Sequence, residues 1–294
     1  DEDMTLEQAQ KYKATALVGD IIEIELETKE VSRIAADKGK HVIRQGIREA
    51  EHGKLREEFQ SHNQEIVTAK VSRVDPETGD AVVEIGKAQE TLFKSEQIPG
   101  ETLVEGKDVK VYITGILNKT KKPIVKISRT AKELVKRLFE TEVPEIYDGT
   151  VEIKSISREA GSRTKMAVWS NDADVDAIGA CIGPKRSRIT AVVNELNGEK
   201  IDIIPWSENP GEFIARALAP AEVIKAVITS LEEKTCTVVV PNNQLSLAIG
   251  NKGQNAKLAA KLTGFKIDIK PQTNPLTGEP AEELAEDYPD ALLA

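Results

Sequence analysis

The spacing of apolar residues divides the first 130 positions into a helical stretch and a β-rich stretch. Residues 31–60 carry apolar side chains at roughly every third or fourth position, which predicts a long helix. From residue 66 the period changes to two, the alternation expected of half-buried strands. A short helix over 6–12 and a strand over 21–26 precede the long helix. Strands are predicted over 66–74, 81–85, 91–93, 109–116 and 124–127, the last two separated by a basic turn with Lys119, Lys121 and Lys122.

These five strands predict a small barrel. An open antiparallel sheet of this size would leave unprotected edges, whereas a closed barrel of the OB type does not. Barrels of this class commonly present one face to oligonucleotides. Phe93, Lys94 and Tyr112 are the candidate contacts for RNA on this barrel. The alternative is that the barrel is a spacer, because its strands lack a cluster of exposed aromatic residues.

An internal repeat fills residues 131–271. The sequence IGPKR at 182–186 aligns with IGNKG at 249–253 at an offset of 67, and the tetrapeptide KIDI occurs at both 200–203 and 266–269. Each copy predicts the order helix, strand, strand, helix, tight basic loop, helix, strand. In the first copy these elements are 131–142, 150–156, 164–169, 176–182, 187–196 and 200–204. In the second they are 210–217, 223–229, 235–240, 243–249, 254–262 and 266–269.

The repeated loop has the features of a phosphate site. Glycine permits a positive φ and close approach of a bulky group to the backbone. The helix that restarts after the loop has unpaired N–H groups, and its dipole favours an anion. Gly-x-x-Gly between two helices is the pattern with which KH domains clamp the RNA backbone. The candidate RNA-binding residues are Gly183, Pro184, Lys185, Arg186, Arg188 and Ile189 in the first copy, and Gly250, Asn251, Lys252, Gly253, Gln254, Asn255 and Lys257 in the second.

The two loops differ at their second and fourth positions, and the fourth bears on the turn. Arg186 stands where the second copy has Gly253, so we expect it either to strain the turn or to push the nucleic acid outward. The second loop is therefore expected to bind phosphate more strongly. A nucleotide-binding P-loop fits the sequence poorly, because no Gly-x-x-x-x-Gly-Lys-Ser/Thr sequence occurs. Ile182, Ile189, Ile249 and Leu258 beside the loops are expected to divide between the core and the floor of a groove.

Composition and charge narrow the function classes further. The net charge is −9, but residues 1–30 and 275–294 each carry −6, which leaves +3 on the body between them. The segment after residue 271 is expected to be an acidic, weakly ordered tail. No apolar run approaches the roughly 18 residues of a membrane span. His41, His52 and His62 lack metal-ligand spacing, so neither a metal nor a cofactor is expected. With only two cysteines, Cys181 and Cys236, the chain is expected in a reducing cytoplasm.

The barrel followed by two KH modules resembles the NusA family of bacterial transcription factors. The motifs that carry the resemblance are SEQIPGE at 95–101, EVPEI at 142–146, REAGSRTK at 158–165, GACIG at 179–183 and AIGNKGQN at 248–255. The resemblance extends from about residue 6 to residue 270. It implies an S1-type barrel and two KH domains that form one extended surface for nascent single-stranded RNA. It also implies that the N-terminal head docks on RNA polymerase, and that the protein modulates pausing, termination and antitermination together with other elongation factors, without catalysis.

The expected fold is therefore multidomain α+β. A partial N-terminal α/β head and long helix occupy residues 1–62, an S1-type OB barrel 63–130, and two type II KH domains (α-β-β-α-α-β) 131–205 and 206–271. Family members carry further elements before the equivalent of residue 4, so the head is expected to be truncated, which leaves its docking on polymerase an open question at this point. The alternative function is that of an RNA-processing or ribosome-associated KH/S1 protein, such as the accessory region of an exoribonuclease. The family of such exoribonucleases has the order KH then barrel, opposite to this chain.

Overall fold

The computed structural model describes residues 5–21, 33–118 and 123–273, which fall into two compact units, 1–54 and 55–294. The first unit contains α1 (Leu6–Gln10) and most of the long helix α2 (Arg33–Ser61), close to the limits expected from the sequence. Most of the expected strand at 21–26, the basic turn at 119–122 and the acidic tail from 274 lie outside the described residues. The domain limits at 62, 130, 205 and 271 remain predictions.

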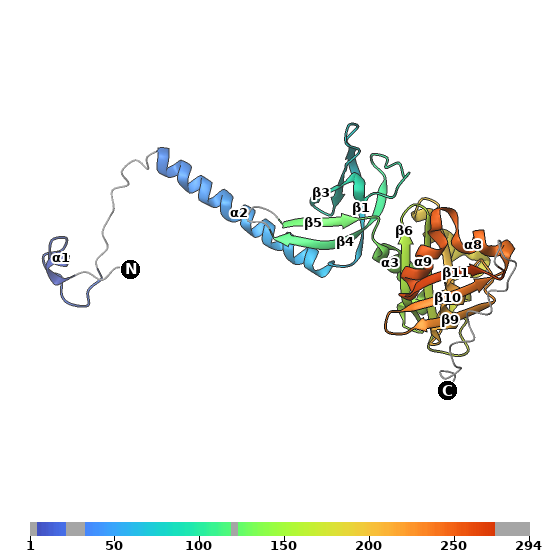
Figure 1. The fold of residues 1–294 in the computed structure, drawn as a ribbon. Coiled ribbons are helices and arrows are strands. Elements are labelled where there is room, and N and C mark those ends of the chain that lie inside the picture. Colours follow the sequence, from blue (N-terminus) through green and yellow to red (C-terminus); the bar gives the residue numbers. More distant parts are fainter. Residues whose placement is uncertain (1–4, 22–32, 119–122, 274–294) are drawn as a thin grey trace. The chain divides into compact units, whose positions relative to one another are not determined.

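Five antiparallel strands form the barrel at the start of the second unit (Figure 1). The sheet order is β3-β2-β1-β4-β5, and contacts between β3 and β5 nearly close it. Its core consists of apolar residues that alternate along the strands, such as Val71, Val83, Leu92, Val111 and Ile113. The strands are β1 (Ile66–Val74), β2 (Ala81–Ile85), β3 (Ala88–Leu92), β4 (Asp108–Asn118) and β5 (Pro123–Ser128).

The expected limits of the third strand, 91–93, were wrong. β3 pairs with β2 from Ala88 onward, opposite Ile85, so the loop between them has only two residues, Gly86 and Lys87. Gly86 has a φ of 58°, as tight hairpin turns of this length require. The first three residues of the strand, 88–90, were missed because the side chains at 89 and 90 are polar, although Glu90 is buried.

Two modules with the same order of elements follow the barrel. The strand order is β6-β7-β8 in the first and β9-β10-β11 in the second, and in each the central strand is antiparallel to one neighbour and parallel to the other. The first module comprises α3 (Lys132–Glu142), α4 (Pro144–Tyr147), β6 (Val151–Glu159), β7 (Arg163–Ser170), α5 (Ala177–Ile182), α6 (Ser187–Glu195) and β8 (Lys200–Pro205). The second comprises α7 (Pro210–Ala217), β9 (Lys225–Ser230), β10 (Thr235–Val240), α8 (Leu245–Ile249), α9 (Gln254–Thr263) and β11 (Lys266–Pro271).

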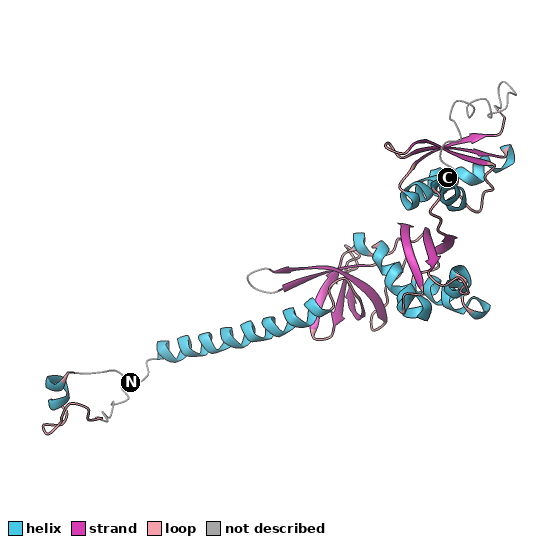
Figure 2. Cartoon of the chain, turned by 90° about the horizontal axis from the view of Figure 1, so that it is seen from below, coloured by secondary structure: helices cyan, strands magenta, loops and turns pink. Residues whose placement is uncertain are grey.

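The repeat predicted these elements except the short helix α4, whose first residue, Pro144, has the fixed φ that suits a helix start. In the second module the helices cover one face of the sheet (Figure 2). Short 3₁₀ turns complete both modules, at Pro184–Arg186, Asn242–Gln244 and Asn251–Gly253.

The two modules share a core. Ala167 and Ile204, on the sheet of the first module, are buried in one cluster with Phe213, Ile214 and other residues of the second. The helices of the second module thus cover the face of the β6–β8 sheet that the helices of the first module leave open. A hydrogen bond from Gln254 Nε2 to Ser162 Oγ (2.7 Å) adds a polar link between the modules.

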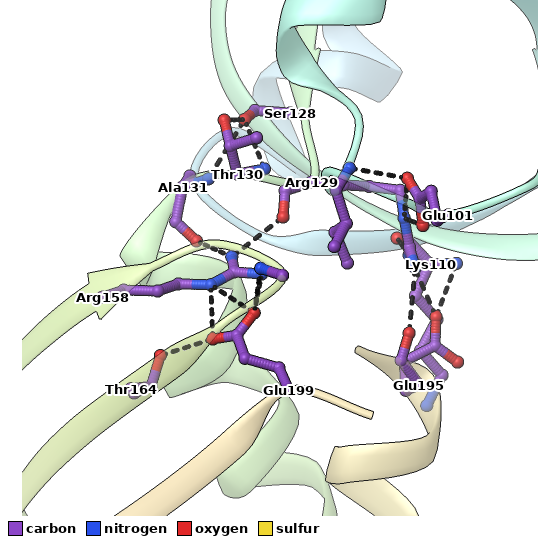
Figure 3. A network of polar contacts seen from close by, with 12 residues as sticks. Glu101, Lys110, Ser128, Arg129, Thr130, Ala131, Arg158, Thr164, Glu195 and Glu199 are labelled. Carbon is purple, nitrogen blue, oxygen red and sulfur yellow. Dashed lines mark hydrogen bonds and ion pairs between the residues drawn. The ribbon is translucent and has the colours of Figure 1, made fainter. Parts of the chain in front are cut away.

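Buried charged groups join the barrel to the first module (Figure 3). Arg158 and Glu199 form an ion pair of 2.9 Å, with side chains 1% and 0% exposed. Arg158 also donates to the carbonyls of Arg129 and Ala131, in the segment that leaves the barrel. Arg129 in turn pairs with Glu101 of the barrel and with Glu195 at the end of α6, both at 3.0 Å. Because each charge has a partner, the junction avoids the large cost of an isolated buried ion.

Candidate nucleic-acid interface

The two repeated loops have the same backbone conformation. Gly183 and Gly250 have φ/ψ of 73/171° and 76/172°. Lys185 and Lys252 follow with 50/30° and 51/27°. Arg186 then takes 64/21°, close to the 75/15° of Gly253. A hydrogen bond of 3.1 Å closes each turn, from the fourth residue's N–H to the first residue's carbonyl.

Arg186 therefore does not change the turn. Of the two expected effects, the structure shows strain: a non-glycine residue in the left-handed region, which costs about 1–2 kcal/mol. The expectation that the first loop is the weaker binder is not tested by this geometry.

The first glycine of each loop is required by space. A Cβ on Gly183 would lie 2.6 Å from Arg188 Cγ, and a Cβ on Gly250 would lie 2.8 Å from the backbone nitrogen of Asn255. The fourth position is open, because a Cβ on Gly253 meets only Lys257 Cε at 3.6 Å. A side chain is therefore excluded at the first position of the loop but has room at the fourth.

Two of the predicted RNA-binding side chains instead support the loops from within the protein. Arg188 Nη1 donates to Glu145 Oε2 (2.8 Å) and to the carbonyl of Ala180 (2.7 Å). Asn255, at the equivalent position, is 1% exposed and donates to the carbonyls of Leu218 and Ala248. Each ties the helix after the loop to the helix before it, so we now propose positioning roles for both.

The cations of the loops are exposed. Pro184, Lys185 and Arg186 in the first loop, and Asn251 and Lys252 in the second, face solvent. Among the described residues, none forms an ion pair or a side-chain hydrogen bond with Lys185 or Arg186. Lys257 Nζ lies 3.2 Å from the carbonyl oxygen of Lys252, beside the second loop. Gln254 is directed to Ser162 of the first module.

The apolar candidates divide between core and surface. Ile189 and Leu258 are buried in the cores of their modules, so Ile189 is not available as a base contact. Ile182 is half-buried, whereas Ile249 and its neighbour Leu247 are 38% and 45% exposed. The second module therefore presents more apolar surface next to its loop than the first, where Ala180 stands in place of Leu247.

On the barrel, the expectation for Tyr112 was wrong. Its side chain is 7% exposed and packs with Leu134 and Leu138 in the core that the barrel shares with the first KH module. The alternating pattern of the strand could not show that a second module covers this face. Phe93 is 57% exposed, and Lys94 next to it is also exposed, with its Nζ 3.2 Å from Gln97 Oε1. These two remain candidate contacts.

The two tryptophans pack against each other rather than forming separate platforms. The rings of Trp169 and Trp206 meet edge to face, with centroids 5.5 Å apart, and Phe213 contacts Trp206. The Nζ of Lys154 lies 5.2 Å from the centre of the Trp206 ring. This cluster lies where the first KH module continues into the second, and it explains the tryptophans as packing residues.

Sequence reasoning missed the residues that hold the modules together. Lys165 is fully buried, and its Nζ donates to the carbonyl of Ala219 (2.7 Å) and lies 3.3 Å from Asp202. Burial lowers the pKa of Lys165. Ser162, Lys165 and Arg158 all belong to the motif REAGSRTK, and Glu101 belongs to SEQIPGE. The motifs marked these residues as distinctive, but the sequence did not show their side-chain partners, which are distant along the chain.

No group of three or more His, Cys, Asp or Glu in the described ranges is placed to hold a metal ion. In those same ranges, no helix combines the length and the apolar character needed to cross a membrane.

The fold and the two loops define a protein with a barrel and tandem KH modules, a class that binds RNA through the loop between two helices. Family models agree. The model of the NusA N-terminal domain matches residues 1–53, that of the NusA-like first KH domain residues 129–206, and that of the NusA-like second KH domain residues 210–275.

Curated relatives extend the match over most of the chain. A protein of Bacillus subtilis (strain 168) named transcription termination/antitermination protein NusA is 50% identical over 272 residues, covering 92% of this chain and 72% of the relative. Proteins of the same name from Halalkalibacterium halodurans and Thermus thermophilus are 49% and 42% identical, each over 92% of this chain and over 70% and 69% of the relative. The chain belongs to the NusA family.

Proposed function

We propose that this chain is a non-catalytic transcription factor that binds nascent single-stranded RNA through its two KH loops. The observation that carries the proposal is the shared loop geometry: two turns of the same backbone conformation, each with an exposed cation at its tip, Lys185 and Lys252. Each turn opens a helix of nine or ten residues, whose first N–H groups favour an anion. A phosphodiester backbone is the ligand that this arrangement suits.

Single-stranded rather than duplex RNA is the proposed form, because bases must be unstacked to lie on a small apolar surface. Leu247 and Ile249 offer such a surface beside the second loop. The exposed ring of Phe93 on the barrel offers one stacking surface more. Duplex RNA keeps its bases paired and would reach only the cations.

The junctions let both loops act on one strand. The ion pair of Arg129 with Glu195 and the hydrogen bonds from Arg158 to the carbonyls of Arg129 and Ala131 fix the barrel to the first module. Lys165 and Gln254 fix the second module to the first. Two sites held at a fixed separation bind one RNA with a gain in effective concentration. This supports binding to a continuous segment of transcript.

The effect on transcription is inferred from family membership. The relatives are named for termination and antitermination, and residues 1–53 match the N-terminal domain of that family. We propose that the first unit contacts RNA polymerase in the bacterial cytoplasm while the second unit holds the emerging RNA, so that pausing and termination change.

Binding to a 12-nucleotide single-stranded RNA, measured by fluorescence anisotropy over a salt series, tests the proposal. Duplex RNA and single-stranded DNA of the same sequence are the comparisons. We expect single-stranded RNA to bind more tightly than either comparison. The logarithm of its association constant should fall as the logarithm of the salt concentration rises. Equal binding to duplex RNA, or phosphate-dependent degradation of the RNA by the purified chain, would contradict the proposal and favour an RNA-processing protein.

A further inference from the structure

The strained residue Arg186 lacks a structural explanation within the fold. Its φ of 64° is unfavourable for a residue with a side chain, and the equivalent position in the second module is a glycine. Its side chain is exposed, and none of the described residues pairs with it. A strained backbone that the surrounding contacts do not explain points to a function for the side chain.

The second module shows which space the side chain of Arg186 occupies. A Cβ placed on Gly253 would lie 3.6 Å from Cε of Lys257, the fourth residue of α9. The side chain of position 253 would therefore start next to the charged end of Lys257. That end already lies against the loop, because Lys257 Nζ contacts the carbonyl of Lys252 at 3.2 Å.

The first module has the opposite arrangement. The residue equivalent to Lys257, at the offset of 67, is Thr190, whose short side chain carries no charge. The pair Gly253 and Lys257 is thus replaced by Arg186 and Thr190. Each loop keeps one cation at its tip and one cation beside it. In the first module the second cation is Arg186, in the loop. In the second module it is Lys257, in the helix that follows the loop.

We propose that Arg186 and Lys257 are equivalent phosphate-binding cations. Each binds the phosphodiester group of the RNA that lies at the same place relative to its own loop. The proposal rests on the proposed binding of single-stranded RNA and assigns to Arg186 a role that compensates for Thr190. It follows that the two loops bind phosphate with similar strength, contrary to the ranking that the sequence suggested.

Exchange variants of the full chain test this inference. Arg186→Gly should weaken binding of a 12-nucleotide single-stranded RNA about three- to fivefold, the scale of an exposed ion pair. The slope of log K against log salt should become shallower by about 0.7, as expected for one lost contact to a single strand. Arg186→Gly combined with Thr190→Lys, which recreates the arrangement of the second module, should restore both the affinity and the slope.

Two controls separate charge from structure. Arg186→Asn keeps a residue that tolerates the left-handed region but removes the charge, so it should lose as much affinity as Arg186→Gly. Thermal melting should not fall in Arg186→Gly, since the substitution relieves strain.

The outcomes are distinct. Unchanged affinity and slope in Arg186→Gly, or no recovery on adding Thr190→Lys, would overturn the inference while leaving RNA binding by the wild type intact. Absence of single-stranded RNA binding by the wild-type chain would overturn the proposed function and this inference together.

Discussion

Arg158 and Glu199 form a buried ion pair at the point where the barrel meets the first KH module. Glu199 also accepts hydrogen bonds from the backbone N–H of Gly161 (2.9 Å) and from the hydroxyl of Thr164. The pair therefore holds the β6–β7 hairpin against residues 129–131, the segment that leaves the barrel. Its contribution is to position the modules as well as to stabilise them.

Glu199→Gln should lower the free energy of unfolding by about 3–5 kcal/mol, because it leaves Arg158 buried without a counter-ion. Chemical denaturation of the full chain measures this change. Glu152→Gln is the matched control, since Glu152 pairs with Lys154 on the surface, and its effect should stay below about 0.5 kcal/mol. Similar small effects from both substitutions would show that the junction does not depend on this pair.

Lys165→Met should weaken the binding of a long RNA while leaving the affinity for a short RNA unchanged. The substitution removes the link to the Ala219 carbonyl and so loosens the second module from the first. One KH loop clamps about four nucleotides, so a tetranucleotide should bind as before. A 12-mer that reaches both loops should bind roughly tenfold more weakly, because effective concentration is lost. Lys136→Met, at an exposed position on α3, is the control, and equal losses for both RNA lengths in Lys165→Met would contradict the positioning role.

The two thiols should be protected in the folded protein. Cys181 and Cys236 are buried and free, and burial raises their pKa values to about 12 and about 11. A thiol reagent at pH 8 should modify neither until the chain unfolds. Unfolded thiols lose their protons from about pH 9, before the folded ones, so the folded state is progressively destabilised above that pH. Replacing Cys181 with Ala should reduce this alkaline loss relative to the wild type. Rapid labelling of the native protein would contradict the assigned burial.

Phe93 and Tyr112 should respond differently to substitution by alanine. Phe93 is exposed on the barrel, so Phe93→Ala should leave thermal melting unchanged and weaken RNA binding by about 1–3 kcal/mol if it stacks on a base. Tyr112 is buried against α3, so Tyr112→Ala should lower stability by about 3–5 kcal/mol. Unchanged RNA affinity in Phe93→Ala would favour the barrel as a spacer.

Much of this fold could be predicted because its patterns are local. The alternation of apolar and polar residues identified the barrel strands, the third with wrong limits, and the repeat of KIDI after a basic loop located both KH modules. The assignment of Tyr112 was wrong for a non-local reason, because it placed the residue on a surface that another module covers. The bonds of Asn255 and Arg188 to the carbonyls of Ala248 and Ala180 are local, but residue type alone does not distinguish such a bond from a contact with RNA. The role of Lys165 in joining the two modules could not be predicted, because the carbonyl that it contacts, that of Ala219, lies 54 residues away in the second module.

The most direct test of the account is reversal of the charge at both loop tips. Lys185→Asp with Lys252→Asp should abolish most binding of the 12-nucleotide single-stranded RNA and make the salt dependence shallower by at least about 1.4, as expected for two lost phosphate contacts. Both side chains are exposed, so melting should not change. Lys136→Asp with Lys225→Asp makes the same change in net charge at exposed positions on α3 and β9, outside the loops, and should retain binding. RNA affinity that stays at the wild-type value in the loop variant, or that falls equally in the control, would contradict the assignment of the loops as the RNA-binding site.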